Sequence, residues 1–92
     1  MAQTITSRPV VVGKKPAVNY ALAVATRYGE GAVPVVLRAR GRFCSTAFDA
    51  ANKAINMGLP LARGDVRWGQ EPGPEGKQVS WVEIELIGKG VA

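Results

Sequence analysis

The sequence predicts one α/β domain of two layers, a four-stranded mixed sheet with two helices on one face. Strand-like and helix-like apolar patterns alternate along the 92 residues in the order β-α-β-α-β-β. Crossovers between parallel strands are right-handed, so two of them in the same direction place both helices on one face. Hydrophobic residues make up 47% of the chain, yet none of the apolar runs reaches the ~20 residues of a membrane span.

The first strand–helix unit follows a polar segment, residues 1–8, that we expect to be a flexible tail before a single domain over residues 9–92. Pro9–Val12 is a short apolar run typical of a buried strand. Apolar side chains recur at helical spacing from Pro16, which suits a first helical position, and glycines 29 and 31 suit the helix end. The predicted apolar stripe of this helix is Val18, Ala21, Leu22, Ala25 and Tyr28.

The second unit begins with a predicted strand over Val33–Arg40, which Gly41 interrupts. A helix is expected from residue 42 or 43 to Asn56, and Gly58 and Pro60 end it. The predicted apolar stripe of this second helix is Cys44, Ala47, Phe48, Ala51 and Ile55.

A hairpin completes the predicted sheet. Residues 61–70 contain its first strand, with Val66 and Trp68 on one face and Arg67 on the other. The segment EPGPEGK, residues 71–77, holds two prolines and two glycines and is expected to form the tip.

The last strand is predicted over residues 79–87. Its alternation slips at Trp81–Val82, which indicates a bulge or a twist there. Glu83 and Glu85 are expected on a solvated face, and both tryptophans under the hairpin.

The charge of the chain is concentrated in its first half. The net charge is +5. Residues 1–42 hold seven basic and one acidic side chain, giving +6, whereas residues 43–92 hold five basic and six acidic, giving −1. Most charge runs only solubilise a surface, but so complete an asymmetry favours a polyanionic partner.

The predicted topology gathers basic residues at one edge, because parallel strands all end at the same side of the sheet. Both helices then begin beside cations, which their dipoles disfavour unless an anion binds there. If the third strand is parallel to the first two, the hairpin tip leaves from this edge as well. The candidate anion-binding residues are Lys14, Lys15, Asn19, Tyr20, Arg38, Arg40, Arg42, Arg67 and Lys77.

The sequence offers no catalytic constellation, so we predict that the protein is not an enzyme. It has no histidine and one cysteine, Cys44, which excludes a disulfide and histidine catalysis and argues against a metal site. The glycine motifs of the P-loop and of dinucleotide-binding turns are absent, so no cofactor is expected. An extended polyanion therefore fits the basic turns better than a mononucleotide, and a small phosphate-handling enzyme is the disfavoured alternative.

Two segments, VVVGKKPAVNYALA and VVLRARGRFCSTAFDA, followed by a basic hairpin, resemble the Alba family of small archaeal chromatin proteins over residues 9–88. The resemblance implies a fold like the C-terminal domain of translation initiation factor three. It also implies a dimer that binds double-stranded DNA, and often RNA, without strong sequence preference. The expected location is the cytoplasm, on the chromosome (nucleoid).

The resemblance also assigns residues. The family's lysine pair falls on Lys14 and Lys15, its tyrosine on Tyr20 and its second-turn arginines on Arg40 and Arg42. Lys14 matches a position acetylated in some members, which implies an acetyltransferase and a deacetylase as partners. Many members carry a phenylalanine before the Leu-Pro that ends the second helix, where this chain has Gly58. Side-by-side association of dimers is therefore expected to be weak.

The sequence-based hypothesis is a dimeric protein that coats and compacts duplex DNA through phosphate contacts. The alternative is an RNA-binding protein of ribonucleoprotein assembly or RNA stabilisation. The dimer is expected to use the second helix and the last two strands, with Phe48 and Ile55 as candidate contacts. It is either a homodimer or a heterodimer with a second Alba chain, without a membrane partner.

Overall fold

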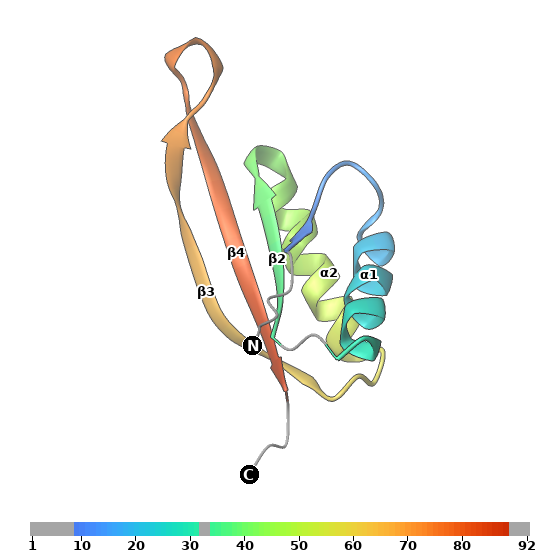
Figure 1. Cartoon of the computed structure of the whole chain (residues 1–92). Coiled ribbons are helices and arrows are strands. Elements are labelled where there is room, and N and C mark those ends of the chain that lie inside the picture. Colours follow the sequence, from blue (N-terminus) through green and yellow to red (C-terminus); the bar gives the residue numbers. More distant parts are fainter. Residues whose placement is uncertain (1–8, 32–33, 89–92) are drawn as a thin grey trace.

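The chain folds as a four-stranded sheet with two helices, as predicted (Figure 1). A computed structural model describes residues 9–31 and 34–88, so the tail expected at residues 1–8 lies outside the described residues. The elements are β1 (Val10–Val11), α1 (Ala17–Gly29), β2 (Val35–Arg40), the 3₁₀ turn η1 (Gly41–Phe43), α2 (Cys44–Asn56), β3 (Leu61–Pro72), the 3₁₀ turn η2 (Pro74–Gly76) and β4 (Gln78–Gly88).

The strand order is β1-β2-β4-β3. β1 is parallel to β2, while β4 is antiparallel to both of its neighbours, β2 and β3. β3 therefore runs in the same direction as β1 and β2. Both strand–helix turns and the hairpin tip consequently leave from one edge of the sheet, as predicted for a third strand parallel to the first two (Figure 1). We call this the basic edge.

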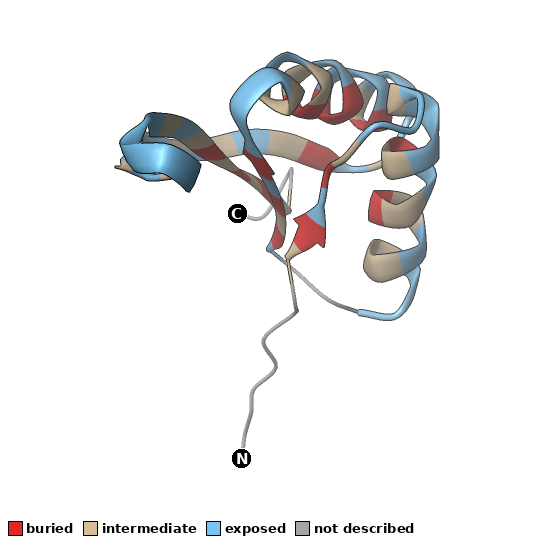
Figure 2. Cartoon of the chain, turned by 90° about the horizontal axis from the view of Figure 1, so that it is seen from above, coloured by how far each residue is buried: buried red, intermediate tan, exposed pale blue. Residues whose placement is uncertain are grey.

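Both helices cover the same face of the sheet, and the core lies between the two layers (Figure 2). β2 and β4 turn alternate apolar side chains toward the helices, and these are almost completely buried: Val35, Leu37, Ala39, Val82, Ile84 and Leu86. The residues between them point to the opposite face. Among residues 9–31 and 34–88, no helix packs on that face, which we call the open face.

The small residues of α2 allow this helix to pack closely against its neighbours. Four alanines on α2 are completely buried: Ala47, Ala50, Ala51 and Ala54. Ala47 and Ala51 of the predicted stripe are confirmed as buried, and its other three members are half-buried. The buried Ala50 and Ala54 were not predicted.

The predicted stripe of α1 is wrong at two positions. Ala21 and Val24 are fully buried, but Val18 and Leu22 are 49% and 52% exposed. The helix lies at the side of the molecule, where its neighbours include α2 and the two-residue β1 (Figure 1). Because so little sheet lies under it, only a narrow face of α1 is covered.

The bulge in the hairpin lies on β3 and not on β4 as predicted. Trp81 pairs regularly with Gly69, and Val82 with Trp68, so β4 is continuous there. The apolar pattern of β4 slips because Val79 and Trp81 lie on the open face, opposite residues of β3 and β2 that also face it. The register shifts between Arg63 and Val66, one extra residue on β3.

Candidate functional site

The first turn of the basic edge presents Lys14 and Lys15 on a loop that Tyr20 holds in place. Both lysines are exposed. The Tyr20 hydroxyl oxygen accepts hydrogen bonds from the backbone N–H groups of Gly13 (2.9 Å) and Lys15 (3.2 Å). A Cβ at Gly13 would lie 3.3 Å from this oxygen, closer than an ordinary contact. Tyr20 therefore positions the lysine loop from α1, and its own hydroxyl hydrogen is left to donate to an anion.

The second turn carries Arg40 at the end of β2 and Arg42 in η1. Neither α1, η1 nor α2 has an acidic side chain in its first turn. The Arg42 guanidinium lies 5.1 Å from the centre of the Phe43 ring, a cation–π distance. Both helix starts thus place cations at the positive end of a helix dipole without a carboxylate in the first turn, which favours an anion there.

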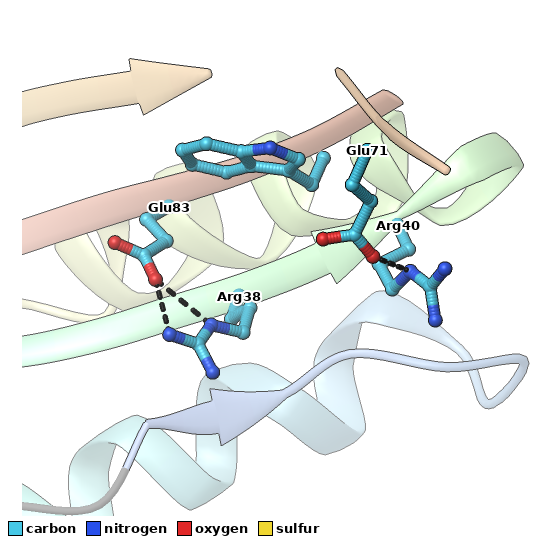
Figure 3. A pocket seen from close by; sticks show the side chains of 5 residues that line it. Arg38, Arg40, Glu71 and Glu83 are labelled. Carbon is cyan, nitrogen blue, oxygen red and sulfur yellow. Dashed lines mark hydrogen bonds and ion pairs between the residues drawn. The ribbon is translucent and has the colours of Figure 1, made fainter. Parts of the chain in front are cut away.

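Two of the predicted anion-binding arginines lie on the open face and are paired within the chain. The Nε of Arg38 donates to Oε2 of Glu83 at 2.8 Å (Figure 3). The Nη2 of Arg67 donates to Oε1 of the same carboxylate at 3.4 Å. The side chain of Glu83 is only 16% exposed. The hydrogen bond from Arg38 is the main cause that lowers the pKa of Glu83 below its ordinary value. Arg38 and Arg67 therefore form a structural cluster with Glu83.

Arg40 is also paired, with a carboxylate of the hairpin. Its Nε lies 2.6 Å from Oε2 of Glu71 on β3. A hollow of about 370 Å³ on the open face is lined by both ion pairs and by Trp81 (Figure 3). Sequence reasoning missed Glu71 and Glu83 as partners of these arginines.

The remaining candidates are solvent-facing. Asn19 is exposed on α1, and Lys77 is exposed directly after η2 at the hairpin tip. Within the part of the chain that the structure describes, Lys14, Lys15, Arg42 and Lys77 form no ion pair with a carboxylate. These four cations come from three separate segments of the basic edge.

A second surface lies on the helix side of the hairpin. Trp68, which faces the same side as Val66, is 74% exposed, so its predicted burial under the hairpin is wrong. The reason is that Trp68 lies on β3, the edge strand of the sheet, where the helices cover it only in part. Phe48 and Trp68 line a hollow of about 490 Å³, and the Arg63 guanidinium lies 5.9 Å from the centre of the Phe48 ring.

Gly58 has a φ of +89°, a conformation that favours glycine just after a helix. A Cβ there would meet no atom within 4 Å. Among the described residues, the position where the resemblance implied a phenylalanine ring is thus open space here.

The structure shows no catalytic or metal centre in residues 9–31 and 34–88. No three His, Cys, Asp or Glu side chains gather there in a way that would hold a metal ion. Burial raises the pKa of the Cys44 thiol, which disfavours the nucleophilic thiolate. In the same residues, no helix combines the length and apolar character needed to cross a membrane.

Comparisons with known sequences find no matching family model but several similar proteins. The chain is 38% identical over 87 residues to the DNA/RNA-binding protein Alba of Nanoarchaeum equitans, covering 87% of this chain and 97% of that protein. It is 46% identical over 55 residues to the DNA/RNA-binding protein Alba of Methanoculleus marisnigri. That alignment covers 60% of each chain, less than two thirds of the relative's length.

Two solved structures are similar to this chain. Alba from Thermoplasma volcanium has a TM-score of 0.78 and 34% identity, covering 87% of this chain and 99% of that one. ALBA1 from Trypanosoma brucei has a TM-score of 0.75 over 91% of this chain and 74% of its own. At 15% identity, the second likeness concerns the fold alone.

Proposed function

Because this chain belongs to the Alba family, we propose that it is a dimeric protein that coats and compacts double-stranded DNA through its phosphate backbone, without sequence preference. The relatives are named as DNA/RNA-binding proteins. The family is one of nucleic-acid-binding proteins and not of enzymes, in agreement with the sequence-based prediction.

The observation that carries this proposal is the convergence of cations at the basic edge. Lys14, Lys15, Arg42 and Lys77 come from two strand–helix turns and the hairpin tip, and none is engaged by a carboxylate of the described residues. Side chains of this kind contact phosphates and carry no base preference of their own. An extended phosphate backbone can touch all three segments together.

The dimer is supported by the apolar surface on the helix side of the hairpin. Trp68 is a large, exposed aromatic residue beside the half-buried Phe48, with Ile55 further along α2. Aromatic residues in such a position are typical anchors of a protein interface. The partner in the dimer is a second copy of this chain or a second Alba chain. Association of one dimer with another should be weak, because Gly58 offers no side chain there.

RNA binding is the second candidate function. The names of the relatives include RNA, and cations that contact phosphates serve both nucleic acids. Parallel titrations of duplex DNA, duplex RNA and single strands at one salt concentration separate the two. Tighter binding of folded RNA than of duplex DNA would favour this second function.

The salt dependence of DNA binding tests the phosphate contacts. The logarithm of the binding constant falls with the logarithm of salt concentration at a slope near −0.9 per phosphate neutralised. We expect Lys14→Ala, Lys15→Ala and Arg42→Ala each to reduce this slope by about 1 per site, equally for all sequences. Lys53→Ala, on the exposed surface of α2, is the matched control and should have little effect. An equal loss with Lys53→Ala would show that the basic edge is not the binding surface.

Lys14 is also our candidate for regulation by acetylation, which would require an acetyltransferase and a deacetylase. Its exposed position at the basic edge supports this, since acetylation removes the charge that a phosphate contacts. Lys14→Gln should weaken DNA binding in the same direction as Lys14→Ala, and unchanged affinity in both variants would remove Lys14 from the surface. A protein with this function acts in the cytoplasm, on the chromosome.

A further inference from the structure

A second hollow lies at the basic edge, and neither the ion pairs nor the proposed duplex contacts account for its apolar lining. It has a volume of about 450 Å³ and lies where the ends of β1 and β2, the turn η1 and the hairpin come together. Its apolar side chains include Val11, Phe43, Pro74 and Val79. We call it the edge hollow.

The rim of the edge hollow is strongly basic. Arg38, Arg40 and Arg42 all contribute to its lining. Arg42 lies over the Phe43 ring, while the other two are held by carboxylates. An apolar hollow of this size under a positive rim fits a ligand with a flat apolar part and an attached anion.

Val11 is an apolar part of the edge hollow that water reaches freely. Its side chain is 70% exposed on the open face, although it lies in a strand between the buried Val10 and Val12. It is paired in register with Arg38, so an apolar and a basic side chain are adjacent there. A nucleotide offers both matching parts, since its base stacks on apolar and aromatic groups and its phosphate contacts arginine.

We propose that the edge hollow binds an unpaired nucleobase of a single strand, with the neighbouring phosphates on the cations of the basic edge. A base in a duplex is stacked and paired, so it cannot enter the hollow without being extruded. Single strands, loops and frayed ends present unstacked bases directly. The inference rests on the proposed function, because the same cations hold the backbone of either ligand.

The test compares strands that share a charge but differ in their bases. Fluorescence anisotropy would measure affinity for a short oligothymidylate, an oligouridylate, an abasic sugar–phosphate strand of equal length and a DNA duplex. Val11→Ser and Phe43→Leu should weaken binding of the two base-carrying strands at least about fivefold, as the loss of one base contact does. In Val11→Ser, affinity for the abasic strand and for the duplex should not change. Phe43→Leu also removes the ring beneath the Arg42 guanidinium, so in that variant a further loss, equal for all four ligands, is expected. Comparison of the affinities for the oligothymidylate and the oligouridylate shows whether the hollow prefers a DNA or an RNA strand.

The matched control is Val18→Ser, which makes the same change at a valine 49% exposed on α1. It should leave all four affinities unchanged. Circular dichroism would confirm that Phe43→Leu folds, since this ring packs against the core, and Val11→Ser carries the test without that concern.

Several results would overturn the inference. Equal affinity of the unaltered protein for abasic and base-carrying strands would do so, as would unchanged single-strand affinity in both variants. A change of sedimentation coefficient in Val11→Ser would show that a second protein copy covers the hollow. If duplex binding persists in any of these cases, the proposed function stands. A protein that binds none of the four ligands would overturn both.

Discussion

Arg40, the last residue of β2, forms an ion pair of 2.6 Å with Glu71 of the hairpin. The Arg40 guanidinium, which the sequence predicts to bind a phosphate, is therefore paired with a carboxylate of the same chain. The side chains are 54% and 41% exposed, so the pair is weak and a phosphate can displace the carboxylate. We therefore propose that Glu71 competes with a phosphate for Arg40.

Glu71→Gln should therefore raise the affinity for duplex DNA and make its salt dependence steeper by about 1 per site, since Arg40 becomes available to a phosphate. The free energy of unfolding should change by less than about 1 kcal/mol, because the pair lies on the surface. Filter binding at several salt concentrations would measure the first effect. Glu30→Gln, just beyond the other end of α1, removes the same charge and should change the slope far less. Weaker binding in Glu71→Gln would show that the pair serves to orient Arg40.

Tyr20→Phe should weaken DNA binding although it removes no charge. The loss of the hydroxyl leaves the N–H groups of Gly13 and Lys15 without their acceptor, which costs about 1 kcal/mol of stability and loosens the lysine loop. The salt slope should remain that of the unaltered protein, since the same cations are present. Thermal unfolding and DNA titration would measure the two effects.

Tyr28→Phe is the control for this prediction, because Tyr28 lies half-buried on the same helix. Its hydroxyl forms no hydrogen bond with another residue of the described chain. If the two variants lose affinity equally, the Tyr20 hydroxyl does not hold the loop.

The stability of the protein should decrease in acid because of Glu83. Arg38 lowers the pKa of this carboxyl in the folded state, so the ionised form stabilises the fold. This contribution is complete above the ordinary glutamate pKa of about 4.3 and is lost as the pH falls through the lowered folded value. Glu83→Gln should lower Tm at neutral pH. Below about pH 4, Tm should then decrease less steeply with falling pH than in the unaltered protein. If the fall of Tm in acid is the same in Glu83→Gln as in the unaltered protein, other carboxyls cause the acid sensitivity.

Trp68→Ser should shift the protein from dimer to monomer. The Trp68 ring is 74% exposed in one chain, and burial of such a ring in an interface contributes strongly to association. Sedimentation equilibrium at micromolar concentration would detect the shift. Leu22→Ser, at an apolar side chain 52% exposed on α1, should leave the dimer intact. A monomeric unaltered protein would refute the dimer itself.

Much of the fold could be predicted because its signals are local. The alternation of Val82, Ile84 and Leu86 with glutamates specified a strand and its two faces, and apolar spacing specified both helices. The predicted element ends agree with the structure to within about two residues, the usual difference between assignments. The convergence of the two basic turns also followed from strand direction. The place of the hairpin tip beside them was predicted only on the condition that the third strand is parallel to the first two, which the structure meets.

The partners of the arginines could not be predicted from local patterns. Arg38 and Glu83 are 45 positions apart, and they meet because β4 inserts between β2 and β3, a strand order that no local pattern specifies. The buried face of α1 was misjudged for the same kind of reason, since the covering elements lie elsewhere in the chain. The exposure of Trp68 depends on the place of β3 at the edge of the sheet, which the strand order sets.

The extra residue on β3 sets the orientation of everything beyond it in the hairpin. At this point the N–H of Asp65 donates to Oε1 of Glu85 at 3.4 Å, and a Cβ at Gly64 would lie 2.9 Å from Ile87. Side chains alternate strictly along a strand, so a shift by one residue exchanges its faces. Regular pairing of the same residues without this bulge would exchange the faces of the strand beyond it, turning Trp68 toward the open face and Arg67 toward the helix side. Deletion of Gly64 would instead leave Val66 opposite Ile84 and both faces unchanged. The position of Trp68 on the helix side and of Arg67 on the open face thus depends on one additional residue in β3.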